Sequence, residues 1–143
     1  MHSITLQTQD RSQVLALDSI DRFEDGSGYR ALLFVQSGAF ACRQEFFFED
    51  ATLAAAIAGL ETMDAGTPAA ATIRGSFEDD YIRLESNSRG HVLVTGEIHE
   101  HGELGQMLRF GFRTDQTVLG PLIRDLNQLR SRTAAPVASA REA

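Results

Sequence analysis

Apolar and polar residues alternate most regularly in the stretch 88–129. Its first part places Val92, Val94 and Ile98 on one side of an extended chain. A second run, after a polar turn, also places its apolar residues on one side, and two such runs are typical of a half-buried antiparallel strand pair. Residues 114–117 can cap a helix, after which apolar residues recur at helical spacing. The pattern predicts two strands followed by a helix. Its other apolar positions are Leu108, Phe110, Phe112, Leu119, Leu122, Ile123, Leu126 and Leu129.

Shorter alternating runs predict further strands in the first part of the chain. Three consecutive phenylalanines, Phe46, Phe47 and Phe48, either form an adhesive surface or belong to a core strand, and the second interpretation is the simpler one. Residues 19–28 are rich in acidic residues and glycine, which favours a loop. The runs that predict strands are 3–6 and 14–17, both expected at a sheet edge, then 29–36, 39–48, 70–77 and 81–86.

A helix is predicted between these groups of strands. Acidic residues at 49–50 suit its positive N-terminal end, and Leu53, Ile57 and Leu60 share one helical face. Gly66 is a suitable residue for ending the helix.

The predicted fold class is α+β. We expect a mostly antiparallel, curved sheet of about seven or eight strands, built from β-hairpins, with helices at about 50–64 and 117–131 packed on it. Residues 1–130 are predicted to form a single domain. Residues 131–143 are rich in Ala, Arg, Ser and Thr without an apolar period, which predicts a disordered C-terminal tail.

The chain is acidic, with a formal net charge of -7, and its basic residues other than histidine are all arginine. Because nucleic-acid affinity depends on neutralising phosphates, we expect no nucleic-acid partner. The charge fits a basic protein partner, whose approach it would accelerate, and it fits simple solubility equally well.

The chain has one cysteine, Cys42, no apolar leader at Met1–Asp10 and no apolar run long enough for a membrane helix. These features predict a cytoplasmic protein without a membrane partner. A small buried hydrophobe is the favoured role for Cys42, because no Cys-His-Asx pattern accompanies it.

Candidate catalytic and metal-binding groups are few. His99 and His101 point the same way on a strand and could share a metal ion, but Gly102 follows, so we expect a solvated turn. His91 is interpreted as a structural histidine and Asp115 as a helix N-cap. Motifs for phosphate loops, nucleophilic serine, paired cysteines and zinc proteases are absent. The sequence therefore predicts a protein that is not an enzyme and that has no metal site and no cofactor.

The segments GHVLVTGEI at 90–98 and LRFGFRTDQT at 108–117, with the phenylalanine-rich strand before the first helix, carry a family resemblance. The chain resembles the small bacterial domains grouped with the WapI-type immunity proteins of contact-dependent toxin systems. The resemblance covers roughly Gly28 to Leu129. Residues 1–25 and the alanine-rich tail have no counterpart.

This resemblance implies an immunity protein that neutralises a toxin by binding over its active site or substrate groove. The acidic balance fits such a role, because nuclease toxins tend to be basic. The expected contact residues come from two acidic segments that we expect in solvent: Asp21, Glu24 and Asp25, and the turn Glu78, Asp79 and Asp80. Two alternatives stay open: a structural domain that homodimerises through an exposed sheet edge or face, and a small-molecule binder or enzyme.

Overall fold

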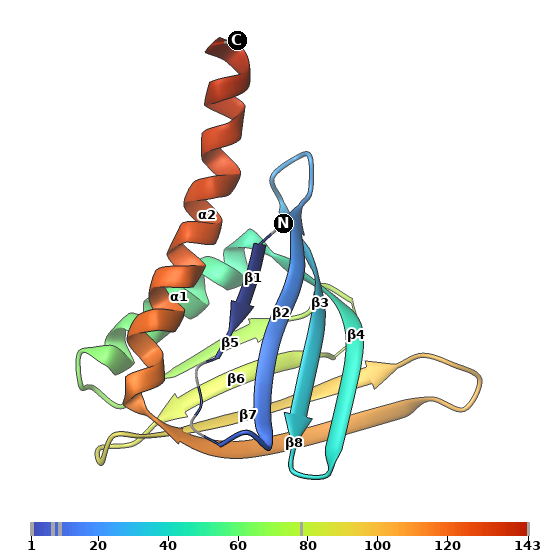
Figure 1. The fold of residues 1–143 in the computed structure, drawn as a ribbon, viewed down its shortest axis with the longest axis vertical. Helices are drawn as coiled ribbons and strands as arrows, with labels where there is room; N and C mark the ends of the chain where they lie inside the picture. The colour runs from blue at the N-terminus through green and yellow to red at the C-terminus, as the bar shows by residue number, and fades with distance from the viewer. Residues whose placement is uncertain (1, 7, 9, 78, 143) are drawn as a thin grey trace.

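The computed structural model describes residues 2–6, 8, 10–77 and 79–142, with side chains up to residue 131. Four strands are followed by a helix, and this order then occurs a second time (Figure 1). The elements are β1 (His2–Thr5), β2 (Gln13–Arg22), β3 (Gly28–Ser37), β4 (Phe40–Glu49), α1 (Asp50–Asp64), β5 (Ala70–Arg74), β6 (Tyr81–Ser86), β7 (His91–Glu100), β8 (Gln106–Asp115), the 3-10 turn η1 (Gln116–Val118) and α2 (Leu119–Glu142).

The strands form two four-stranded sheets in which neighbouring strands are antiparallel. The first sheet has the order β1-β2-β3-β4 and the second has the order β5-β6-β7-β8. In Figure 1 the strands of the first sheet, coloured blue to cyan, run across those of the second, coloured green to orange. This is the arrangement of sandwiches with crossed sheets. The predicted α+β class, with antiparallel strands and two helices, is confirmed, and the structure adds that the strands divide into two sheets.

Apolar residues at alternate strand positions fill the space between the sheets. Val92 and Val94 of β7 are fully buried, as are Leu33 and Val35 of β3 in the other sheet. Burying one such side chain contributes about 1.5–3 kcal/mol, so these inner faces supply most of the force that holds the sheets together. The inward positions predicted from the sequence are buried at Val92, Val94, Ile98, Phe110, Phe112, Leu119, Leu126 and Leu129.

β2 is longer and more central than the sequence predicted. It continues to Arg22 and pairs with both β1 and β3, so it is not an edge strand, and the predicted loop 19–28 begins only after Arg22. The register shifts between Asp18 and Asp21, where Ser19 has a φ of 51°. Such a bulge interrupts the alternation of side chains between the two faces, which is why the sequence pattern ended early.

α1 lies against the outer edge of β5. Gly59 approaches so closely that a Cβ atom built on it would be 2.5 Å from the carbonyl oxygen of Ala70. Next to it, the hydroxyl of Thr52 accepts a hydrogen bond of 3.2 Å from the backbone N–H of Arg74. The helix therefore covers a sheet edge that would otherwise be open to another strand.

One ion pair joins the beginning of α1 to α2. Arg130 donates two hydrogen bonds of 3.0 Å to the two carboxylate oxygens of Asp50, and the hydroxyl of Tyr29 donates a third, of 2.8 Å. The bonds from Arg130, with a smaller contribution from Tyr29, hold the pKa of Asp50 below its usual value. This contact therefore links α1, in the first half of the chain, to α2, in the second half.

α2 continues to Glu142, past the helix end predicted at about residue 131. Figure 1 shows its second half extending away from the two sheets. The side chains beyond residue 131 and all of residue 143 lie outside the described part of the chain. The disordered tail at 131–143 and the single domain at 1–130 therefore stay predictions.

Replacing Gly59 with alanine should destabilise the fold, because the new methyl group meets the Ala70 carbonyl oxygen and forces α1 away from β5. We expect a loss of about 1–3 kcal/mol in the free energy of unfolding, measured by urea titration. Gly120→Ala is the matched control, since nothing lies within 4 Å of a Cβ atom at that helical position. That variant should gain up to about 1 kcal/mol. Equal effects at both positions would contradict the close approach of α1 to β5.

Asp50→Asn should lower stability at pH 7, because the Arg130 ion pair loses its charge. A carboxylate with a lowered folded-state pKa contributes stability above its unfolded pKa, near 3.8 here, and loses that contribution as the pH falls through the lower folded value. The stability difference between wild type and variant should therefore be constant near neutral pH and shrink below pH 3.8. Urea titrations over this pH range test it, with Asp64→Asn at the other end of α1 as the control. A difference independent of pH would be contrary to this assignment.

Candidate functional site

Three phenylalanines from distant parts of the chain gather beside the end of β4. The ring of Phe47 in β4 lies 6.3 Å from the ring of Phe23, which follows β2, and 5.3 Å from the ring of Phe77, in the loop after β5. Phe77 is 62% exposed, and the other two are half-buried. We call Phe23, Phe47 and Phe77 the aromatic surface.

Backbone hydrogen bonds hold the two loops that carry this surface. Phe23 N donates to Gly28 O at 2.9 Å, which closes the loop between β2 and β3. Ser76 N donates to Phe47 O at 2.7 Å, which ties the β5–β6 loop directly to the edge of β4. The aromatic surface is therefore positioned by the strands beneath it.

The two acidic segments singled out in the sequence adjoin this surface, although more than fifty residues separate them in the chain. Glu24 and Asp25 are exposed in the loop next to Phe23, and Asp79 is exposed two residues after Phe77. Asp21 lies in β2, where its carboxylate is 3.4 Å from the guanidinium of Arg30. Glu78 lies outside the described residues.

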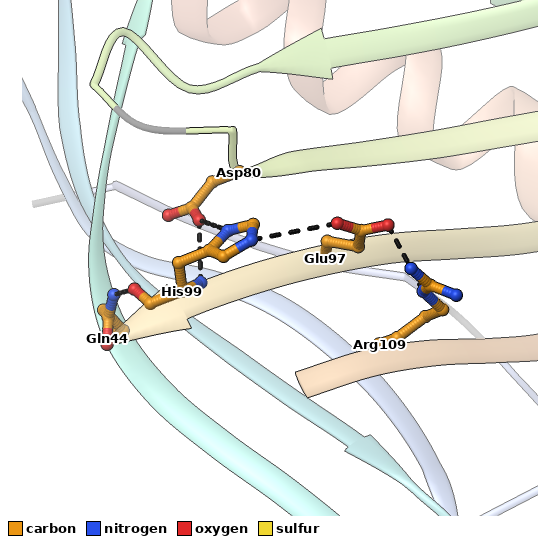
Figure 2. Close-up of polar contacts among 5 residues, drawn as sticks. All are labelled: Gln44, Asp80, Glu97, His99 and Arg109. Carbon is orange, nitrogen blue, oxygen red and sulfur yellow. Dashed lines mark hydrogen bonds and ion pairs between the residues drawn. The ribbon is translucent and has the colours of Figure 1, made fainter. Parts of the chain in front are cut away.

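Asp80 departs from the prediction that the whole acidic turn is in water. It is 6% exposed, and its Oδ1 accepts hydrogen bonds from the backbone N–H of His99 at 2.7 Å and from the Nδ1 of the His99 ring at 2.8 Å (Figure 2). A buried carboxylate needs such partners, and the neighbouring strand β7 supplies them. The expectation that Asp80 is exposed to solvent is wrong, because the turn folds back onto β7, whereas its role as a contact residue stays a prediction.

The Asp80–His99 pair continues into a chain of polar contacts across the outer face of the second sheet (Figure 2). The Nε2 of His99 is 3.8 Å from Glu97, whose other carboxylate oxygen is 3.3 Å from the Nε of Arg109. On the opposite side, the side-chain amide of Gln44 in β4 donates to the carbonyl oxygen of His99. These contacts connect the end of β4 to β7 and β8.

A hollow of about 160 Å³ opens between the aromatic surface and Asp80. Its wall is mostly apolar: Phe46, Phe47 and Phe77 contribute aromatic rings, and Glu45 and Asp80 are its two acidic residues. No arginine is among its lining residues in the described part of the chain. The lining residues are Gln44, Glu45, Phe46, Phe47, Gly75, Phe77, Asp80 and His101.

The two histidines considered as metal ligands are not placed as a chelating pair. His99 lies within β7 and is mostly buried, so its prediction as part of a solvated turn is wrong, whereas His101 is exposed. Their rings stack with centroids 6.3 Å apart, and the Nδ1 of His99 is occupied by Asp80. Among the residues that the structure describes, no group of three His, Cys, Asp or Glu side chains could hold a metal ion.

Cys42 packs against the core and also lines a hollow of about 370 Å³ beside Gln44 and Glu100. Burial, and to a lesser degree the charge of Asp80, raises the pKa of the Cys42 thiol. A raised pKa keeps the thiol protonated, which is the opposite of what a nucleophile needs. No histidine is among the residues that line this hollow in the described part of the chain.

A small cavity lies in the interior, and it has no room for a metabolite. The cavity between the sheets and helices measures about 40 Å³, and aliphatic side chains such as Leu15, Leu60 and Ile82 line it. A space of this size without polar partners suits at most a solvent-sized molecule.

Asp115 is a helix N-cap, as predicted: its carboxylate accepts from Thr117 N at 2.9 Å, and the bonds from Thr117 lower the pKa of Asp115.

Sequence reasoning missed the aromatic surface. Phe46 and Phe48 are core residues, as expected for the Phe46–Phe48 run, but Phe47 points to the outer face and its ring meets Phe77. Phe47 alternates with Phe46 and Phe48 along β4, so the sequence could have indicated that its ring lies on the opposite face of the sheet. Nothing in the sequence indicated that Phe23 and Phe77 would join it.

No protein-family model, curated protein or solved structure matches this chain. Within the described ranges, no helix has both the length and the apolar character that crossing a membrane requires.

His99→Ala should lower the free energy of unfolding by about 1–3 kcal/mol, because the buried Asp80 carboxylate loses the donor at Nδ1. Thermal and urea unfolding measure the loss. His101→Ala is the control, since that ring is exposed, and its effect should stay within about 0.5 kcal/mol. If both variants were equally stable, the Asp80–His99 pair would not hold the turn.

Proposed function

We propose that this protein is a non-catalytic, cytoplasmic protein-binding domain that acts as an immunity protein and neutralises a basic toxin by direct contact. The observation that carries the proposal is the aromatic surface, Phe23, Phe47 and Phe77, with exposed carboxylates on both of its loops. Interfaces concentrate their binding energy in a few aromatic anchors surrounded by a polar rim. The resemblance to WapI-type immunity proteins supplies the expected class of partner.

Charge supports a basic partner. Glu24, Asp25 and Asp79 are exposed on the loops of the aromatic surface, and the whole chain carries a formal net charge of -7. Such an acidic rim accelerates the approach of a basic protein. The rings of the aromatic surface, once the partner covers them, determine how slowly the complex dissociates.

The non-catalytic part of the proposal is supported by the way the polar groups are used. The Nδ1 of His99 is hydrogen-bonded to Asp80, and the raised pKa of Cys42 favours its protonated thiol. Cys42 packs against the core, and the hollow of about 370 Å³ that it lines contains no histidine in the described part of the chain.

A second candidate function is homodimerisation through β8. This ten-residue edge strand pairs with β7 alone among the described strands, and one side-chain bond, from Ser37 to Gly111 O at 3.2 Å, reaches it from the other sheet. An open edge can pair with the same edge of a second copy. Light scattering over a range of concentrations tests this: a constant monomer mass rejects it, and a dimer mass supports it.

Reversing two rim charges, with Glu24→Lys and Asp79→Lys together, should slow association with a basic partner by about tenfold at low salt, because the steering field is lost. The partner is obtained by cross-linking and affinity capture from the native cell, and its association rate with wild type and variant is measured after purification. A toxin encoded beside the gene is the first protein to test.

Glu61→Lys with Glu103→Lys is the matched control, since both residues are exposed on other parts of the chain and the change in net charge is the same. The control should associate at close to the wild-type rate. Equal slowing in both variants, or capture of an acidic partner only, would count against this surface. Failure of the chain to protect cells that express the neighbouring toxin would count against the immunity role.

A further inference from the structure

The residues that line the aromatic hollow include a carboxylate with one oxygen available, that of Asp80. Both hydrogen bonds of Asp80 to His99 use Oδ1. Within the described part of the chain, no residue donates to its Oδ2, and Figure 2 shows this oxygen turned away from the His99 ring. Asp80 is 6% exposed and lines the hollow, so a carboxylate that is largely shielded from solvent forms part of its wall.

The walls of this hollow are largely aromatic. The rings of Phe47 and Phe77 meet edge to face at 73°, with centroids 5.3 Å apart. Glu45, which also faces Arg30 at 3.5 Å, adds a second carboxylate to the lining. Ring faces attract a cation through their quadrupole, and a carboxylate attracts it through its charge, so both features favour the same kind of ligand.

We propose that this hollow is an arginine pocket: it receives the guanidinium of one arginine side chain of the basic partner. The inference rests on the proposed function and names the chemistry of its central contact. The guanidinium stacks on Phe77 or Phe47, donates one N–H to Asp80 Oδ2 and turns its remaining donors toward Glu45. A guanidinium fits this arrangement better than an ammonium, because it is flat, more weakly hydrated and presents several donors in one plane.

The pocket is held in place before any partner arrives. Gly75 N donates to Asp80 O at 2.8 Å and closes the loop that carries Phe77, while the bonds from His99 fix the carboxylate. Preorganised groups lose little freedom when a ligand binds. We therefore expect the pocket to bind an arginine side chain even when the rest of the partner protein is absent. A cation would also offset the cost of keeping Asp80 charged inside the protein.

The test uses N-acetyl-arginine amide as the probe and the isotope-labelled full chain as the receptor. NMR titration should show saturable shifts at Phe47, Phe77 and His101, with a dissociation constant in the millimolar range. N-acetyl-lysine amide should bind about threefold or more weakly, and N-acetyl-alanine amide should cause no saturable shift.

Phe77→Ala should weaken binding of the arginine probe by about tenfold. Phe40→Ala is the matched control, because Phe40 is a phenylalanine of similar exposure, 68%, that does not line the hollow. Asp80→Asn provides a second variant that keeps an acceptor for His99 N, and it should abolish the saturable shifts while the His99 amide signal still reports a folded turn.

Saturable binding that is lost in Phe77→Ala and Asp80→Asn but kept in Phe40→Ala supports the arginine pocket. Absence of saturable shifts, equal binding of the lysine probe, or binding that ignores both pocket variants overturns it. The two proposals fail separately. A basic partner that binds Asp80→Asn and wild type alike removes only the pocket, because Asp80 is not part of the aromatic surface, whereas probe binding without any toxin protection removes only the immunity role.

Discussion

The structure depends on the burial of two inner sheet faces against each other. Leu33 and Val35 from one sheet and Val92 and Val94 from the other are fully buried. Non-directional apolar contact of this kind draws the sheets together, and the side chains of α1 and α2 complete the same core. The polar contacts of the candidate site lie outside this core, on the outer face of the second sheet and in the β2–β3 and β5–β6 loops.

The repeated order of four strands and a helix explains how the edges are arranged. α1 lies along β5, the first strand of the second half, and the close approach at Gly59 leaves no space for another strand there. The Asp50–Arg130 pair then ties α1 to the helix of the second half. The outer edge of β8 has no strand or helix along it in the described part of the chain.

The candidate site follows from strand parity at the end of β4. Phe46 and Phe48 face inward and anchor the core, so Phe47 must face outward, where Phe23 and Phe77 pack around it. The β5–β6 loop is drawn over this ring by the bond from Ser76 N to Phe47 O, and the same loop delivers Asp80 to His99. One short loop therefore supplies an exposed aromatic ring and a buried carboxylate beside it, which is the combination that the proposed arginine pocket uses.

The sequence by itself determined the local elements. Alternation at Val92, Val94 and Ile98 specified β7 and its inward face, and the capping carboxylate of Asp115 specified where the last helical segment begins, because both depend only on neighbours along the chain. Only the tertiary structure decided the division into two sheets, the extension of β2 past the bulge at Ser19 and the burial of Asp80. These features depend on which distant segments pair, and three adjacent carboxylates look alike in a sequence until one of them meets the N–H groups of a strand nineteen residues away.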